Sequence, residues 1–205
     1  ERGIGGLVWK ADNSKITNSS FKGRIVNSYE TRSPYNIGGL VGQLTGINAV
    51  VDKSKALITI SSNADSTNQT VGGLAGLVEK DALISNSYAE GNINNVKRFG
   101  SVAGVAGYLW DRDSNEERHA GRLHNVLSDV NVMNGNAISG YHYRGMRITD
   151  SYSNKDNRVY KVTLEKMKLS PRNLSKREEQ SLMLLKSQVR NLKSTLLLYR
   201  LLKPC

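Results

Sequence analysis

One short glycine motif occurs three times in this chain: as Ile4-Gly5-Gly6-Leu7-Val8, as Ile37-Gly38-Gly39-Leu40-Val41-Gly42 and as Val71-Gly72-Gly73-Leu74-Ala75-Gly76. A fourth copy is Val102-Ala103-Gly104-Val105-Ala106-Gly107, and a degenerate fifth is Ile138-Ser139-Gly140-Tyr141. The second residues of the five copies are separated by 33, 34, 31 and 36 residues. A regular period of about 20–50 residues is typical of solenoid proteins, so the sequence predicts a repeat fold.

A second motif follows each glycine motif. It is present as Ile16-Thr17-Asn18-Ser19, Ile84-Ser85-Asn86-Ser87-Tyr88, Leu123-His124-Asn125-Val126 and Ile148-Thr149-Asp150-Ser151-Tyr152, with Val50-Val51-Asp52-Lys53 as the nearest match in the second repeat. Alternating apolar and polar residues predict a half-buried strand, and Asn and Ser favour a turn after it. We expect the recurrent asparagines to stack into a structural ladder.

The glycine motif favours a strand over a helix, because each glycine costs about 1 kcal/mol relative to alanine inside a helix. Small residues in a strand permit close backbone approach. Two or three strands per repeat, stacked in parallel on their equivalents, predict an all-β fold: a right-handed parallel β-solenoid of about five coils over residues 1–153. The predicted repeat core consists of Gly5, Gly6, Leu7, Gly38, Gly39, Leu40, Gly72, Gly73, Leu74, Gly104 and Gly107.

Charge and glycine content both divide the chain after residue 153. Residues 1–153 hold 16 Lys and Arg against 14 Asp and Glu, whereas residues 154–205 hold 13 against 4. All 19 glycines lie between Gly3 and Gly145. The net charge of +11 therefore belongs mostly to a C-terminal tail that shares no period with the repeats.

Two interpretations of this basic, leucine-rich tail stay open, and we expect the tail to be helical or disordered. The spacing of Leu185, Val189, Leu192, Leu196 and Tyr199 predicts a basic amphipathic helix, which suits an acidic membrane, a nucleic acid or a partner groove. Alternatively, the tail is a linker read out of frame from A-rich DNA, which makes the chain a truncated or frameshifted fragment.

A charged insertion lengthens the fourth repeat between Trp110 and Leu123. Insertions in solenoids map to loops on one face and often carry partner contacts, but a solvated surface loop is the favoured explanation of the charges. The candidate contact residues are Asp111, Arg112, Asp113, Glu116, Glu117, Arg118 and Arg122.

Catalytic and cofactor signatures are missing from the sequence. The histidines are His119, His124 and His142, and no His-Glu-x-x-His pair exists to hold a zinc ion beside a general base. No Gly-x-Ser-x-Gly motif or phosphate-binding glycine loop occurs, and the one cysteine is Cys205. No apolar run reaches the roughly 18 residues of a membrane-spanning helix. The aromatic residues are scattered along the sequence, so we do not expect the chain to bind nucleic acid by stacking bases on them.

Residues Val71 to Ile93 pair Gly-Gly-Leu-Ala-Gly with Ile-x-Asn-Ser-Tyr-Ala-x-Gly-x-Ile, which resembles the GLUG repeat of bacterial surface proteins. The stretch from Gly3 to Leu164, with its phrase Met146-Arg147-Ile148-Thr149-Asp150-Ser151-Tyr152-Ser153, is similar to the repeat region upstream of the catalytic domain in streptococcal IgA proteases and related zinc metalloproteases. The resemblance implies a secreted or cell-wall-attached virulence protein of the bacterial surface. It implies that the zinc ion and the hydrolase activity belong to a catalytic domain outside this chain. No cofactor is expected within the chain itself.

The leading hypothesis is a non-catalytic repeat region of such a metalloendopeptidase, which positions the protease domain or recognises a host protein such as immunoglobulin A. A second hypothesis is a stand-alone, adhesin-like solenoid that binds a host protein, a glycan or another cell-surface ligand. A third is a membrane or nucleic-acid binder that acts through the tail; salt sensitivity would distinguish it from the other two.

Overall fold

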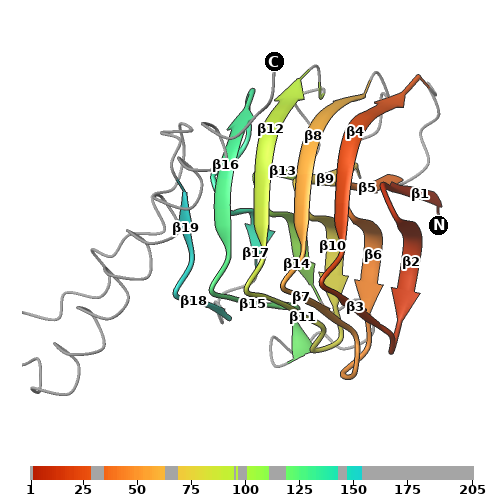
Figure 1. Cartoon of the computed structure of the whole chain (residues 1–205), viewed down its shortest axis with the longest axis vertical. Helices are drawn as coiled ribbons and strands as arrows, with labels where there is room; N and C mark the ends of the chain where they lie inside the picture. The colour runs from red at the N-terminus through yellow and green to blue at the C-terminus, as the bar shows by residue number, and fades with distance from the viewer. Residues whose placement is uncertain are drawn as a thin grey trace, which may run out of the picture. The chain divides into compact units, whose positions relative to one another are not determined.

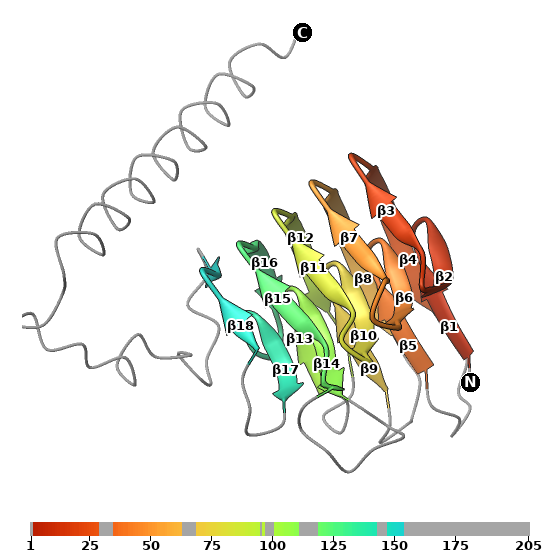
Figure 2. The ribbon, with the colours of Figure 1, turned by 90° about the horizontal axis from the view of Figure 1, so that it is seen from below.

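The chain winds into a stack of similar coils in the computed structural model, which describes residues 2–28, 35–62, 69–94, 96, 101–110, 119–142 and 147–153. Figure 1 shows the strands of successive coils side by side, and Figure 2 shows the coils one behind another from the N-terminal strand β1 onward. The predicted all-β, parallel solenoid is confirmed. The predicted tail, residues 154–205, lies outside the described residues.

Four parallel sheets run along the stack, because each strand pairs with its equivalent in the next coil. The first sheet holds β1 (Arg2–Gly5), β5 (Tyr35–Gly38), β9 (Thr70–Gly72) and β13 (Ser101–Ala103). The second holds β2 (Val8–Asp12), β6 (Val41–Thr45), β10 (Ala75–Glu79), β14 (Ala106–Trp110) and β17 (Ser139–His142). The third holds β3 (Lys15–Thr17), β7 (Val50–Asp52), β11 (Leu83–Ser85), β15 (Arg122–His124) and β18 (Ile148–Thr149). The fourth holds β4 (Ser20–Asn27), β8 (Lys55–Ser62), β12 (Tyr88–Asn94), β16 (Leu127–Val132) and β19 (Tyr152–Ser153).

Each full coil therefore has four strands, and the expectation of two or three was wrong. The last described coil is shorter, since it has strands in three of the four sheets. The register of the fifth glycine motif also differs from the prediction. Ala103 pairs with Asn136, 33 residues later, and Ala106 pairs with Ser139. Ile138-Ser139-Gly140 thus corresponds to the second half of the motif. The spacing between the fourth and fifth copies is therefore 33 residues, where the sequence analysis gave 36.

The glycine motif forms a corner between two strands, where we had expected one continuous strand. In the second coil β5 ends at Gly38, the chain bends through Gly39 and Leu40, and β6 begins at Val41. A Cβ at Gly38 would overlap the carbonyl oxygen of Val41 in the same coil. A Cβ at Gly39 would overlap the carbonyl oxygen of Gly73 in the next coil. Sterics therefore favour glycine at Gly39 and its equivalents Gly6, Gly73 and Gly104, whereas the position of Gly38 is occupied by Ala103 in the fourth coil.

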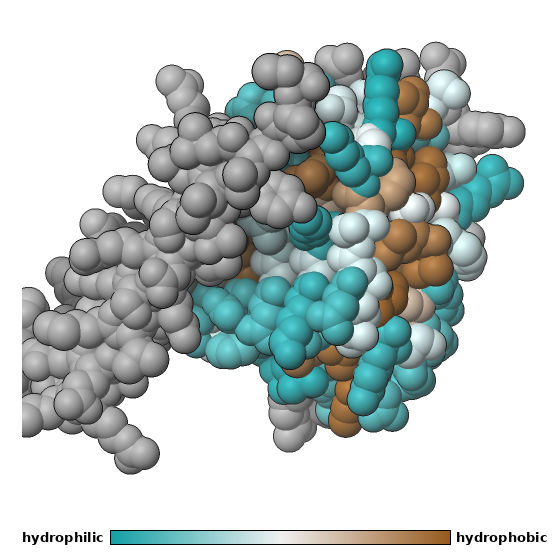
Figure 3. Space-filling view, in the orientation of Figure 1, coloured by the Kyte–Doolittle hydropathy of each residue, from teal (hydrophilic) through white to brown (hydrophobic). Residues whose placement is uncertain are grey.

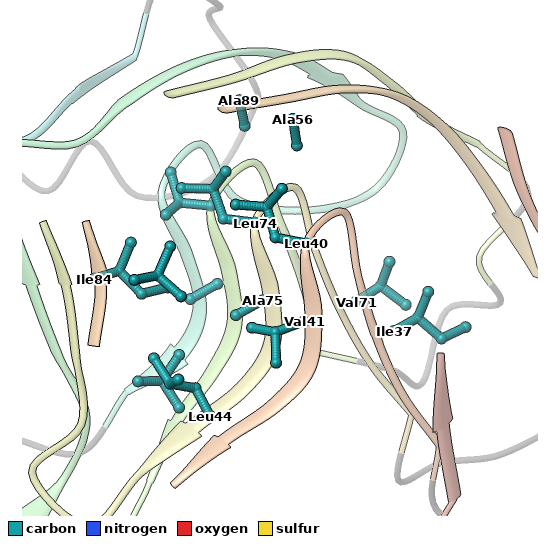
Figure 4. Close-up of a cluster of buried hydrophobic side chains, with 14 of the residues drawn as sticks. Ile37, Leu40, Val41, Leu44, Ala56, Val71, Leu74, Ala75, Ile84 and Ala89 are labelled. Atoms are coloured by element: carbon teal, nitrogen blue, oxygen red, sulfur yellow. The ribbon is translucent and has the colours of Figure 1, made fainter. Parts of the chain in front are cut away.

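The hydrophobic core lies between the sheets and consists of columns of equivalent residues. Figure 4 shows Leu40 beside Leu74 and Ala56 beside Ala89, each pair one coil apart. These four side chains are fully buried. Burial of a leucine side chain contributes roughly 1.5–3 kcal/mol, so stability accumulates from coil to coil. Leu7, the equivalent residue of the first coil, is 40% exposed because no described coil covers it.

Turns after the third sheet use a left-handed residue in every coil: Asn18, Lys53, Asn86, Asn125 and Asp150, with φ between 48° and 50°. Asparagine and aspartate tolerate this conformation better than most residues, which explains why they occupy four of the five positions.

The predicted asparagine ladder forms in part. Asn125 Nδ2 donates to Asn86 Oδ1 over 2.8 Å, and Asn86 Nδ2 donates to Asp52 Oδ1 over 2.7 Å. Lys53 occupies the ladder position of the second coil, so the side-chain ladder continues through the neighbouring Asp52. Asn18 joins Asp52 through its backbone amide, which donates to the Asp52 carbonyl oxygen over 3.1 Å. The Asn86 and Ser85 hydrogen bonds lower the pKa of Asp52.

A serine ladder runs beside the asparagines. Ser87 Oγ donates to the Ser85 carbonyl over 2.6 Å and accepts from the Ser54 amide over 3.1 Å. Ser54 Oγ repeats this arrangement with the Asp52 carbonyl and the Ser19 amide, over 2.8 and 3.2 Å. Each hydroxyl group therefore donates to a carbonyl oxygen in its own turn and accepts from a backbone amide of the preceding coil.

We expect a substitution at the glycine corner to destabilise the solenoid. Gly39→Val places a branched side chain against the Gly73 carbonyl and within 2.9 Å of Ala56 Cβ. Overpacking of this kind costs about 1–3 kcal/mol, measured as the free energy of unfolding in urea. Lys15→Ala, an exposed change, is the control. Equal stability of the two variants would contradict the steric account of the corner.

Ser87→Ala is expected to cost more than Ser19→Ala, although both remove a serine from the same ladder position. Ser87 is 3% exposed, and its loss leaves the buried Ser54 amide unpaired, at about 1–3 kcal/mol. Ser19 Oγ donates only to the Thr17 carbonyl at a partly exposed site, so its loss costs about 0.5–1.5 kcal/mol. Thermal unfolding checks this order, and a reversed order would show that the ladder is not the source of the stability.

Candidate functional site

The predicted partner loop lies between β14, which ends at Trp110, and β15, which begins at Arg122. In the preceding coil only residues 80–82 separate the equivalent strands. Of the predicted contact residues, Arg122 belongs to the described part of the chain. The others, Asp111, Arg112, Asp113, Glu116, Glu117 and Arg118, lie outside the described residues.

Four side chains gather where this loop rejoins the solenoid, and we call Asp81, His119, Arg122 and Arg147 the loop anchor. Asp81 Oδ2 lies 2.6 Å from His119 Nδ1, and Asp81 Oδ1 accepts a hydrogen bond from Arg147 Nη1. Arg122 donates from Nε and Nη2 to the Asp81 carbonyl oxygen over 3.0 and 2.8 Å. The anchor thus ties together three coils through one aspartate.

Backbone contacts fix the same point. The Asp81 amide donates to the His119 carbonyl over 2.8 Å, and Glu79 forms an antiparallel bridge with Ala120. Asp81 itself has a left-handed backbone, with φ of 62°, in the turn between β10 and β11. This conformation directs its carbonyl to Arg122 while its carboxylate faces His119 and Arg147, so one residue serves three partners.

The electrostatics of the anchor favour an ionised Asp81. Burial raises the pKa of this carboxyl group, whose side chain is 13% exposed, but hydrogen bonds from His119 and Arg147 and the charge of Arg147 outweigh the burial. The net result is a lowered pKa. Hydrogen bonds to an ionised group are stronger than neutral ones, so the anchor holds the base of the loop firmly.

Sequence reasoning selected Arg122 as a partner contact and missed Asp81 and Arg147. In the structure the Arg122 guanidinium donates to the backbone of the preceding coil, which assigns it a part in holding the loop. Asp81 and Arg147 are separated by 66 residues. No local pattern signals their pairing, because it arises from the stacking of coils.

His119 and His124, the two histidines whose side chains the structure describes, contact different partners. His119 contacts Asp81, whereas His124 Nδ1 lies 2.8 Å from Thr149 Oγ1 and 3.5 Å from Asp150 Oδ2. Among the described residues, no group of three or more His, Cys, Asp or Glu side chains is placed to hold a metal ion. No helix among them is both long and apolar enough to cross a membrane.

The outer face of the fourth sheet is a second exposed surface, and Figure 3 shows hydrophilic and hydrophobic side chains interleaved across it. Lys22, Leu57, Glu90 and Asp129 lie in one register row from β4 to β16. In this row a lysine lies on the first coil and acidic residues lie on the third and fourth. Tyr88 Oη donates to Glu90 Oε2 over 2.7 Å. This mixture of charged and apolar side chains is typical of a surface exposed to solvent.

The lowered pKa of Asp81 predicts a pH-dependent contribution to stability. A carboxyl group with a lowered folded pKa stabilises the fold above its unfolded value, near 3.8, and loses that contribution as the pH falls through the folded pKa. Asp81→Asn should therefore destabilise the protein at pH 6, and the difference from the parent chain should shrink below about pH 4. Urea unfolding across this range measures the difference. Asp12→Asn, at an exposed pair with Lys10, is the control; a pH-independent effect of Asp81→Asn would contradict the ionised anchor.

Comparisons with known proteins agree with the repeat analysis. The family model of the GLUG motif matches residues 1–26 and 67–94. An immunoglobulin A1 protease of Streptococcus sanguinis is 96% identical over 166 residues, which are 81% of this chain and 9% of that protein. A Streptococcus pneumoniae immunoglobulin A1 protease is 71% identical over the same share of this chain and 8% of its own length. The zinc metalloprotease ZmpC of Streptococcus pneumoniae is 37% identical over 77% of this chain and 8% of its own length.

A solved structure of an IgA1 protease has the same fold. It superposes with a TM-score of 0.72 at 70% identity, over 80% of this chain and 13% of that chain. The chain therefore spans less than a tenth of the length of the sequence relatives that it matches. From its motif, its sequence identity and its fold, this chain contains a GLUG-repeat β-solenoid homologous to one segment of the streptococcal IgA1 proteases and related zinc metalloproteases.

Proposed function

We propose that this chain is the non-catalytic repeat region of a secreted or cell-wall-attached zinc metalloendopeptidase of the IgA1 protease type, in which it recognises the substrate or positions the protease domain. The observation that carries this proposal is the 96% identity to one segment of an immunoglobulin A1 protease. By this reasoning the host partner is immunoglobulin A, and zinc belongs to a catalytic domain elsewhere in the protein.

The geometry supports a role in recognition through rigidity. Each coil is joined to the next by backbone pairing in up to four sheets, and the core columns are fully buried. A loop held by Asp81, His119 and Arg147 on such a scaffold has a fixed origin. Fixed presentation lowers the ordering cost of binding, so the inserted loop is our choice for the substrate contact.

Loop replacement in the Streptococcus sanguinis relative distinguishes the two roles. Residues equivalent to 111–118 are replaced by two glycines, and cleavage of immunoglobulin A1 is followed as kcat and KM. Recognition by the loop predicts a raised KM at an unchanged kcat, whereas a positioning role predicts a lowered kcat. Unchanged values of both parameters would contradict a contribution of the loop.

The isolated chain provides the complementary measurement. It should bind immunoglobulin A1 in biolayer interferometry with a Kd in about the micromolar range, which is typical of small, transient interfaces, and it should not cleave it. Immunoglobulin G is the control ligand, and the loop replacement is the matched variant. Chelator-sensitive cleavage by this chain, or stoichiometric zinc retained after dialysis, would overturn the non-catalytic assignment.

A further inference from the structure

The turn that follows β16 contains Asn134 and Gly135, which form the one Asn-Gly pair in the sequence. Residues 133–135 join Val132, the last residue of β16, to Asn136, which bridges to the next coil. In the second coil, residues 63–69 join the equivalent strands β8 and β9. The turn after β16 is therefore much shorter than its equivalent.

The fold accounts for both residues of the pair. Asn134 is exposed and has a left-handed backbone with φ of 61°, a conformation that asparagine tolerates better than most residues. A Cβ at Gly135 would lie 2.7 Å from the Val102 carbonyl oxygen and would overlap Val132 Cγ1. Sterics thus favour asparagine followed by glycine at this turn.

An exposed asparagine before glycine is chemically labile, because a residue without a Cβ lets its backbone nitrogen approach the preceding side chain. The Gly135 nitrogen loses its proton to hydroxide and attacks Asn134 Cγ. The new N–Cγ bond closes a succinimide ring, and the side-chain nitrogen takes a proton from water and leaves as ammonia. Water then opens the ring. Cleavage of the bond to Cγ gives aspartate, and cleavage of the bond to the backbone carbonyl carbon gives isoaspartate, whose main chain runs through Cβ and Cγ.

Two other asparagines show what protects such a side chain. Asn86 is followed by Ser87, and its Nδ2 donates to Asp52 Oδ1 over 2.7 Å. Asn136 is followed by Ala137, and its Nδ2 donates to two backbone carbonyl oxygens over 2.9 and 2.6 Å. In both cases hydrogen bonds hold the side-chain amide, and the Cβ of the next residue hinders the attack.

Backbone hydrogen bonds hold the turn at both ends. The Met133 amide donates to the Ile93 carbonyl over 3.0 Å, and the Asn136 amide donates to the Val102 carbonyl over 2.9 Å. The Gly104 amide donates to the Asn136 carbonyl over 3.0 Å. Isoaspartate adds one carbon to the main chain between these fixed points. The longer turn therefore disturbs the hydrogen bonds that attach the last described coil to the fourth.

We propose that Asn134–Gly135 is a site of spontaneous deamidation, and that its isoaspartate product releases Asn136 from β13. The last described coil then loosens as the protein ages, whereas the coils before it keep their pairing. The reaction consumes water and needs no enzyme. This inference goes beyond the proposed function and does not depend on it, since it uses neither the inserted loop nor a protease domain.

Isoaspartate mapping tests the modification. The full chain is incubated at neutral and at mildly alkaline pH, labelled by an isoaspartate methyltransferase and analysed by peptide mass spectrometry. We expect label on the peptide that contains residue 134, increasing with time and with pH because hydroxide removes the proton of the attacking nitrogen. Asn134→Gln should lose the label, because its longer side chain cannot close the same ring. Asn131→Gln, at an exposed asparagine of β16 that precedes Val132, is the matched control and should keep it.

Hydrogen exchange measured by mass spectrometry tests the structural consequence. The amides of Gly104 and Asn136 should exchange faster in the aged chain than in the fresh chain. Fresh Asn134→Asp adds the charge without the extra main-chain carbon, so it should exchange like the fresh parent chain. The proposal is overturned if residue 134 is labelled only in chain unfolded by urea, if Asn134→Gln keeps the label, or if the aged chain exchanges no faster than Asn134→Asp.

Discussion

The close approach of neighbouring coils at the glycine corner is the constraint on which the rest of this structure depends. The carbonyl oxygen of Gly73 occupies the space that a side chain at Gly39 would need, and the same contact recurs between Gly73 and Gly104. Backbone hydrogen bonds hold paired strands about 4.8 Å apart, and at that spacing glycine lets the corners of adjacent coils stack. The same stacking places Leu40 beside Leu74 and Ala56 beside Ala89.

Polar groups at the opposite turns are satisfied by the same stacking. The Ser87 and Ser54 hydroxyl groups each bond one carbonyl in their own coil and one amide in the preceding coil. A single 33-residue coil has neither the apolar partner nor the hydrogen-bond partner that it needs. Unfolding of one coil therefore exposes both at its neighbours, which makes stability a property of adjacent pairs.

Departures from the repeat mark the sites of proposed function. The charged insertion of the fourth coil begins after Trp110 and rejoins the solenoid at the loop anchor. Tyr108 and Trp110 stack on each other in the same coil, and the positions equivalent to Tyr108 in the first three coils are polar or aliphatic. Both features use the regular coils as a rigid support. The streptococcal proteases that this chain matches are much longer, and the match covers 9% and 8% of two of them.

The sequence by itself determined the repeat period, the parallel all-β class, the place of the insertion and the asparagine turns, because each follows from short motifs and their spacing along the chain. Four strands per coil, the corner at Gly39 and the register of Asn136 needed the tertiary structure, since one glycine pair suits a strand and a bend equally well. The loop anchor and the contact between Tyr108 and Tyr141 also lay beyond sequence reasoning. Asp81 meets Arg147, and Tyr108 meets Tyr141, only because stacked coils bring residues about one or two periods apart into contact.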